Sequence, residues 1–172
     1  MRNKSAQKSV SIPVSTMLGT VAAWTLAYSG DMLTYTCDAT DETAGVVVPL
    51  HMPKIVDGGN DGVSEISYVE LSYTVGTAAL DAAPAAEIQS VAKAVDGAAP
   101  VVTTKACTVA GVTVTDTKTV DDHLITITPD AALRLNDAGE LILEVLFNKA
   151  ATSTVAITGC KVVYHELMAD AE

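Results

Sequence analysis

The segment "LILEVLFNKAATSTVAITGCKVVYHEL", residues 141–167, indicates the structural class of this chain most clearly. Two apolar runs flank a polar connection, and the second run ends in an aromatic residue and charged residues. Short apolar runs that are separated by turn-forming residues are typical of β-strands. The segment therefore predicts a strand, a turn and a returning strand, a hairpin that lies close to the C-terminus.

A second strand signal lies upstream in "EISYVELSYTV", residues 65–75. Apolar and polar residues alternate here, which is the period of a strand with one buried face. The apolar members are Val69, Leu71, Tyr73 and Val75, and the polar members are Glu70, Ser72 and Thr74. Ile66 and Tyr68 fall on the opposite parity, so we expect a β-bulge or a two-sided start to this strand.

Similar segments occur along the rest of the chain, at residues 23–28, 31–39, 45–52, 100–116 and 123–129. Gly, Asp and Pro, which favour turns, separate them. Aromatic residues make up only 4% of the 172 residues, so Val, Ile, Leu and Ala must form the core. Many short strands at spacings of roughly a dozen residues predict an all-β protein. We expect a single antiparallel β-sandwich or jelly roll over residues 21–172.

Residues 81–97, "DAAPAAEIQSVAKAVDG", support two interpretations. Apolar residues at helical spacing, with Asp81 as a cap and Gly97 at the end, indicate a helix of about three turns. The apolar residues are Ile88, Val91, Ala92 and Val95. The alternative is a strand around residues 86–95 that follows a turn at Pro84. Residues 130–139 predict a short polar connection with about one helical turn.

The charge is unevenly distributed along the chain. The formal net charge is −11, with 21 acidic and 10 basic residues, and this argues against nucleic-acid binding, which needs a basic face. Arg2, Lys4 and Lys8 fall in the first ten positions, which contain no acidic residue. We predict that residues 1–20 form an extended N-terminal arm that leaves its own sandwich and packs on a neighbouring subunit. A solvated terminus is the alternative.

The arm also contains apolar residues that could be buried against a neighbouring subunit, since burial contributes about 25 cal/mol per Å². The assembly residues that we predict are Arg2, Lys4, Lys8, Val10, Ile12, Val14, Met17 and Leu18. Residues 10–28 lack the continuous apolar region of a signal peptide, because Pro13, Gly19 and several hydroxyl residues interrupt it. No run of about 18 apolar residues occurs, so we expect neither a signal peptide nor a membrane span.

Cys37, Cys107 and Cys160 are too far apart for a metal-binding motif. An odd count cannot pair completely within one chain, so we expect free, reduced and mostly buried thiols. The loop "DGGNDG", residues 57–62, offers oxygen ligands but fails the calcium-loop pattern, because Gly59 and Tyr68 occupy positions where that pattern needs ligands. A tight glycine turn is the preferred interpretation, and we expect no metal and no cofactor.

The sequence contains none of the common nucleophile, zinc-protease or phosphate-loop motifs. His51, His123 and His165 stand beside strand residues and do not form a ligand pattern. Only Asp121 and His123 are spaced to share one face of a strand, and we interpret that segment as a surface turn. We therefore expect no catalytic residues and a protein that is not an enzyme.

The order of the segments resembles a known group of proteins. A first strand with Trp24 is followed by "GVVVPLHMP", by "ISYVELSYTVGTAALDAAPAAEIQSVAK", by a Thr-rich stretch and by "ELILEVLFNKAATSTVAITGCKVVYHE". This order, over residues 24–166, is similar to β-sandwich virion structural proteins of tailed phages and virus-like environmental genomes. The resemblance implies a jelly-roll-like fold, a strand rather than a helix within residues 81–97, and no catalytic residues.

Two hypotheses for the function follow. The first is a structural protein of a virus particle, a capsid decoration, turret or fibre-base component that forms a homotrimer and binds the major capsid protein or another virion protein. Such a protein would be made in the host cytoplasm and located in the virion, with neither nucleic acid nor membrane as its partner. The alternative is a carbohydrate- or cell-surface-binding β-sandwich module.

Overall fold

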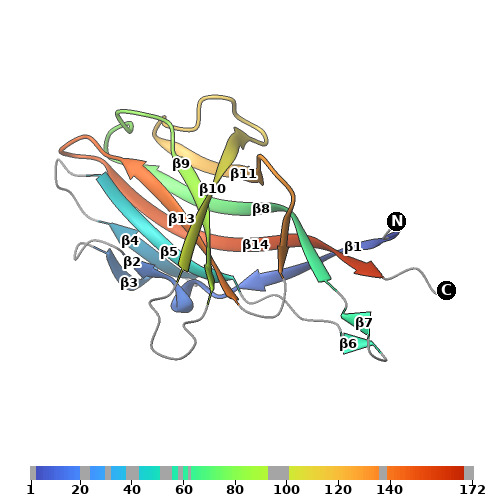
Figure 1. Cartoon of the computed structure of the whole chain (residues 1–172). Coiled ribbons are helices and arrows are strands. Elements are labelled where there is room, and N and C mark those ends of the chain that lie inside the picture. Colours follow the sequence, from blue (N-terminus) through green and yellow to red (C-terminus); the bar gives the residue numbers. More distant parts are fainter. Residues whose placement is uncertain are drawn as a thin grey trace.

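The computed structural model describes residues 3–19, 24–29, 32–37, 43–50, 56–57, 60–61, 63–92, 101–135 and 139–168. These residues form fourteen strands and one short 3-10 turn, η1 (Val14–Thr16), so the predicted all-β class is confirmed (Figure 1). The strands are β1 (Asn3–Ile12), β2 (Leu18–Gly19), β3 (Trp24–Ser29), β4 (Met32–Cys37), β5 (Thr43–Leu50), β6 (Val56–Asp57), β7 (Asn60–Asp61), β8 (Val63–Gly76), β9 (Ala85–Ala92), β10 (Val101–Gly111), β11 (Asp121–Pro129), β12 (Leu133–Leu135), β13 (Gly139–Asn148) and β14 (Thr154–Met168).

Eight of these strands are paired in a nested order. β4 pairs with β14, β5 with β13, β8 with β11 and β9 with β10, all antiparallel. The chain is thus one long double ribbon that is rolled up, so that β14 also pairs with β8 and β13 with β9. One layer has the order β4-β14-β8-β11 and the other β5-β13-β9-β10. This is the strand order of a jelly roll.

The two layers are joined along one side by β10. Its first half, Val101–Ala106, pairs with β9, and its second half, Cys107–Gly111, pairs with β11. At the other margin β3 extends the first layer beyond β4, and β2 extends the second layer beyond β5. The sandwich is therefore closed on the β10 side and ends in edge strands on the opposite side.

The segment at residues 141–167 forms two strands, as predicted, but they do not make a hairpin. β13 and β14 lie in different layers of the jelly roll and pair with other strands. Both strands bury alternate apolar residues, and the two sets face one core from opposite sides because the connection crosses between the layers. The buried residues are Leu141, Leu143, Val145, Phe147, Val155 and Ile157.

The N-terminal segment differs from the expected arm. β1 pairs with β14 of its own chain, and β2 pairs with β5. Ile12, Val14 and Met17 are buried in the chain's own core. The expectation that residues 1–20 leave their sandwich is therefore wrong for the single chain. The physical reason is that β14 offers a free edge beyond the end of β4, and that pairing there buries three apolar side chains.

The other arm residues have varied environments. Val10 is partly buried and packs against the core, whereas Leu18 is 62% exposed. The Lys8 ammonium forms an ion pair with Glu166 of β14. Arg2 lies outside the described residues, and Lys4 is described only through its backbone pairing with Leu167.

The ambiguous segment at residues 81–97 contains a strand, Ala85–Ala92. This strand pairs with β10 on one side and with β13 on the other. The helical periodicity gave the wrong prediction because two ladders of backbone hydrogen bonds and the complete burial of Ile88 outweigh a local preference. Residues 93–97 lie outside the described residues. The helical turn expected in residues 130–139 is also wrong, because Leu133–Leu135 form β12 against β8.

Two local predictions are confirmed. In the "DGGNDG" loop, Asp57 pairs with Asn60, as the expected tight turn requires, and residues 58 and 59 lie outside the described residues. In β8, Tyr68 pairs with Val163 and Ile66 with Tyr164, so Ser67 is the extra residue of a bulge. This bulge brings Ile66 to the same face as Val69.

The core is mainly aliphatic, with one aromatic cluster. The Trp24 ring stacks on Tyr35 at a centroid distance of 5.1 Å, and Phe147 contacts both Trp24 and Tyr73. Beside this cluster, the buried ammonium of Lys149 donates to the backbone carbonyl of Cys37 at 3.2 Å. Cys37 and Cys160 are buried, Cys107 is partly buried, and none of the three is in a disulfide, so the predicted burial of most of the thiols is confirmed.

Candidate functional site

A notch interrupts the edge of β14 on the outer face of the first layer. β14 pairs with β4 over Val155–Ile157 and with β1 from Cys160 onward. Thr158 and Gly159 lie between these two ladders. On the opposite side of β14, Ile157 pairs with Tyr73 and Gly159 with Ser72, so that Thr158 is an extra residue there as well. In the described pairings, the backbone of Thr158 therefore belongs to no ladder.

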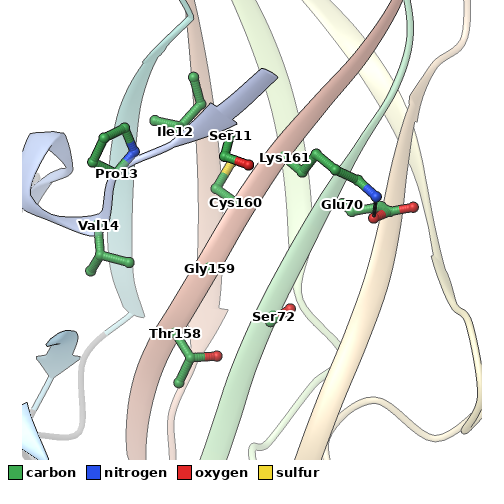
Figure 2. A pocket seen from close by; sticks show the side chains of 10 residues that line it. All are labelled: Ser11, Ile12, Pro13, Val14, Glu70, Ser72, Thr158, Gly159, Cys160 and Lys161. Atoms are coloured by element: carbon green, nitrogen blue, oxygen red, sulfur yellow. Dashed lines mark ion pairs between the residues drawn. The ribbon is translucent and has the colours of Figure 1, made fainter. Parts of the chain in front are cut away.

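A pocket of about 410 Å³ lies over this notch (Figure 2). Three elements form it: the end of β1 with the residues that follow it, the middle of β8, and the bulged part of β14. The lining residues are Ser11, Ile12, Pro13, Val14, Glu70, Ser72, Thr158, Gly159, Cys160 and Lys161. The polar groups of the pocket are three hydroxyl groups, one ammonium and one carboxylate. Gly159 lies among them and has no side chain to fill the space.

The charged groups of the pocket are paired. The Lys161 ammonium forms an ion pair with Glu70, which Figure 2 marks between β14 and β8. Its hydrogen bond to Glu70 raises the pKa of Lys161, and desolvation acts weakly in the opposite direction. Lys161 is therefore a permanent cation at neutral pH. This pair can contact a ligand that carries both donors and acceptors.

Cys160 is the thiol that lines the pocket. Burial raises the pKa of Cys160 to about 12, from an ordinary value of 9.0. The thiolate is the reactive form of cysteine, and at neutral pH this side chain holds its proton. Cys160 therefore acts in the pocket as a small apolar group rather than as a nucleophile.

Two smaller hollows continue the pocket along β8 and β14. One, of about 330 Å³, shares Ser72 and Thr158 with the notch and reaches Thr113 and Asp122. The other, of about 200 Å³, shares Lys161 and reaches β1 at Lys8. Together they make a polar trough that is lined mainly by hydroxyl and charged groups. Such a surface can hydrogen-bond to a hydroxylated ligand or to an extended backbone.

A loop with exposed valines borders the far end of the trough. The loop comprises residues 112–120 between β10 and β11, and we call it the valine loop. Val112, Val114 and Val120 are 49%, 40% and 53% exposed. Apolar side chains that stay exposed on an ordered loop commonly mark contact surfaces.

Hydrogen bonds to backbone carbonyls hold the valine loop in place. The Tyr73 hydroxyl donates to the carbonyl of Thr117 at 2.6 Å. His123 Nε2 lies 2.7 Å from the carbonyl of Thr119, and since a carbonyl only accepts, the Nε2–H is the donor. The Leu80 amide donates to the carbonyl of Lys118 at 2.8 Å. The loop is therefore anchored to β8, β11 and the β8–β9 connection.

His123 is a correction to the sequence analysis. It lies in β11, is only 5% exposed, and its ring packs on Tyr73 at a centroid distance of 5.2 Å. Asp121 and Asp122 are exposed, and the Asp121 carboxylate accepts a hydrogen bond from the Asp122 amide. The surface turn expected here is thus a strand, in which His123 shares the buried face with Ile125. His165 lies at the end of β14, and His51 lies outside the described residues.

The sequence analysis did not identify the notch. One signal was present: the buried residues of β14 are two apart at Val155 and Ile157, but three apart from Ile157 to Cys160. Such a change of spacing at a Thr-Gly pair is typical of a bulge.

Neither a metal site nor a membrane-spanning helix occurs in the described part. In that part, no three His, Cys, Asp or Glu side chains are grouped in a way that could hold a metal ion. No helix among the described residues has the length and apolar character needed to cross a membrane.

No family model matches the chain, and no curated protein matches it significantly.

Proposed function

We propose that the protein is a non-enzymatic structural subunit of a virus particle, a capsid decoration, turret or fibre-base component that self-assembles and binds the capsid surface. The observation that carries the proposal is the nested pairing of β4 with β14, β5 with β13, β8 with β11 and β9 with β10. Viral capsid domains are one of the main groups with this topology. The resemblance of the segment order to virion structural proteins also supports this proposal.

The valine loop supports the proposal, because a subunit of a particle needs a preformed contact surface. Three exposed valines on a loop that is held by hydrogen bonds can enter an interface with little loss of conformational entropy. We assign the valine loop to the contact between copies in a homotrimer. Closed cyclic symmetry is the usual outcome for identical subunits.

A carbohydrate- or cell-surface-binding module is the second candidate. The observation that favours it is the polar trough, where Ser72, Thr158 and the Lys161–Glu70 pair lie around one pocket. Lectin domains also use the jelly roll. In this case the protein would bind a hydroxylated ligand as a monomer.

Native mass spectrometry of the purified full chain tests the proposal. We expect a homotrimer for the unchanged protein and its loss in the double variant Val114→Ser and Val120→Ser. The matched control is Val102→Ser, which removes an equally exposed valine on β10, outside the loop, and should leave the trimer intact. Circular dichroism confirms that each variant is folded.

A glycan array with the same samples tests the second candidate. A monomer that binds a glycan, and loses this binding in Ser72→Ala with Lys161→Ala, would contradict the particle function and support the alternative. A trimer without glycan binding would support the particle function.

A further inference from the structure

The free strand edges of this jelly roll differ in their protection. An edge strand presents unpaired N–H and C=O groups, and proteins usually protect it with lysine, proline, a bulge or very short length. β1 carries Lys4 and Lys8 and has a register shift between Lys4 and Gln7. β5 contains Pro49 and is partly covered by β2. The first half of β10 pairs with β9 on one edge only, and it carries Lys105. β12 has only three residues.

β3 has none of these protections. Its sequence, "WTLAYS", contains no charged residue and no proline, and its ladder with β4 runs without a shift from Trp24 to Ser29. In the described part of the chain β3 pairs only with β4, at the margin of the layer (Figure 1). Thr25 and Ala27 are exposed, and Leu26 is 49% exposed. Among the described residues, this edge is therefore unpaired, and its sequence carries no charge.

The inner side of the same edge is apolar. Trp24 is 8% exposed and stacks on Tyr35. Leu26 lies two residues further along β3, so it shares the face of Trp24 and continues the core to the rim of the sandwich. A second strand beside β3 would cover Leu26 and extend this apolar face.

We propose that β3 pairs antiparallel with β3 of a second copy of this chain, across a two-fold axis near Leu26. Such a pairing is self-complementary, because the same edge supplies donors and acceptors on both sides. Two copies repel each other because each has a net charge of −11. β3 has no charged side chain, so contact between two copies along β3 adds no local repulsion. The two Leu26 side chains then lie opposite each other, and one continuous sheet runs through both copies. This inference does not depend on the proposed particle function.

The experiment measures the oligomeric state of the full chain by native mass spectrometry and by light scattering over a range of concentrations. The unchanged protein is expected to show paired copies, either as dimers or as homotrimers that are themselves joined in pairs. Leu26→Lys places like charges opposite each other and is expected to raise the dissociation constant of the pair at least about tenfold. Val102→Lys, which adds the same charge on the β10 edge, is expected to retain the pair.

A charge-swap experiment separates a lost interface from a misfolded chain. Leu26→Lys mixed with Leu26→Glu is expected to restore pairing as a heterodimer, because opposite charges then face each other. Absence of even-numbered species in the unchanged protein, or a stable pair in Leu26→Lys alone, would overturn the proposal. Substitutions in the valine loop are expected to abolish the trimeric species and to leave dimers that pair through β3. Failure of this inference and failure of the particle function therefore give different mass spectra.

Discussion

Cys160 shows how burial at a single position makes stability depend on pH. The pKa of its thiol is raised to about 12 in the folded chain, and the ordinary value is 9.0. Above about pH 9 the unfolded chain therefore binds fewer protons than the folded chain, and stability falls as the pH rises. Below about pH 9 both states are protonated and the full contribution is present.

Cys160→Ala should reduce the alkaline loss of stability. Each pKa unit corresponds to about 1.4 kcal/mol, so the contribution of this thiol reaches a few kcal/mol as the pH approaches the folded pKa. The free energy of unfolding, measured in denaturant under reducing conditions between about pH 8 and pH 11, checks this. Cys107→Ala should follow nearly the same curve up to about pH 10 and show a smaller effect only close to pH 11, because the pKa of the Cys107 thiol is raised to about 11. Identical pH slopes for Cys160→Ala and the unchanged chain would contradict the prediction.

The burial of individual side chains could be predicted from the sequence where apolar and polar residues alternate. The mostly buried thiols follow from their number and from their apolar neighbours. His123 was misassigned because the adjacent acids suggested a surface position. However, the alternation of His123 with Ile125 and Ile127 is the stronger signal, and all three are buried. A histidine with two apolar neighbours at a spacing of two belongs to their face.

At the scale of elements, the N-terminal segment is an integral part of the sandwich. Deletion of residues 2–18 should prevent stable folding, because it removes Ile12, Val14 and Met17 from the core. Each buried apolar side chain contributes about 1.5–3 kcal/mol, and three together approach the total stability of a typical domain. Thermal unfolding measures the loss.

Deletion of residues 2–9 is the matched control for this experiment. It removes part of β1 but leaves the three core residues, and Gln7, Lys8 and Ser9 are exposed. We expect only a modest decrease of the melting temperature. A chain without residues 2–18 that melts like the unchanged protein would show that the segment does not stabilise the fold.

The valine loop depends on one buried hydroxyl. Tyr73→Phe removes the donor to the Thr117 carbonyl and leaves that acceptor without this bond. We expect a loss of about 1–3 kcal/mol and faster amide hydrogen exchange within residues 112–120. Tyr68→Phe, at a partly exposed position of the same strand, is the control. Unchanged exchange in the loop of Tyr73→Phe would mean that His123 and Leu80 are sufficient to hold it.

The strands were predictable as elements, but their partners were not. The run at residues 141–167 shows two strands and a turn, yet the same pattern fits a hairpin and a crossing between layers. The choice depends on whether the two apolar faces belong to one sheet or to two sheets. Here β13 and β14 lie in different layers, and only the positions of β4, β5, β8 and β9 determine this.

At the scale of the whole molecule, the sequence predicts the all-β class and the sandwich, because β-branched residues alternate with polar ones along most of the chain. The nested order cannot be read in the same way. β4 and β14 pair although they come from distant parts of the chain, and their hydrophobic patterns do not distinguish them from the other strands. The notch is equally hard to predict, because it exists only where β4 and β1 meet the same edge of β14.

The position of β14 also has a consequence for synthesis. β14 is translated after β1, β4 and β8, yet it lies inside its layer, between β8 on one side and β4 and β1 on the other. Until it emerges, the nascent chain exposes the edges of β4 and β8 and the apolar residues that β14 covers. Premature termination before residue 154 would thus release an aggregation-prone polypeptide rather than a smaller domain. Folding of the first layer therefore has to wait until β14, residues 154–168, has been translated.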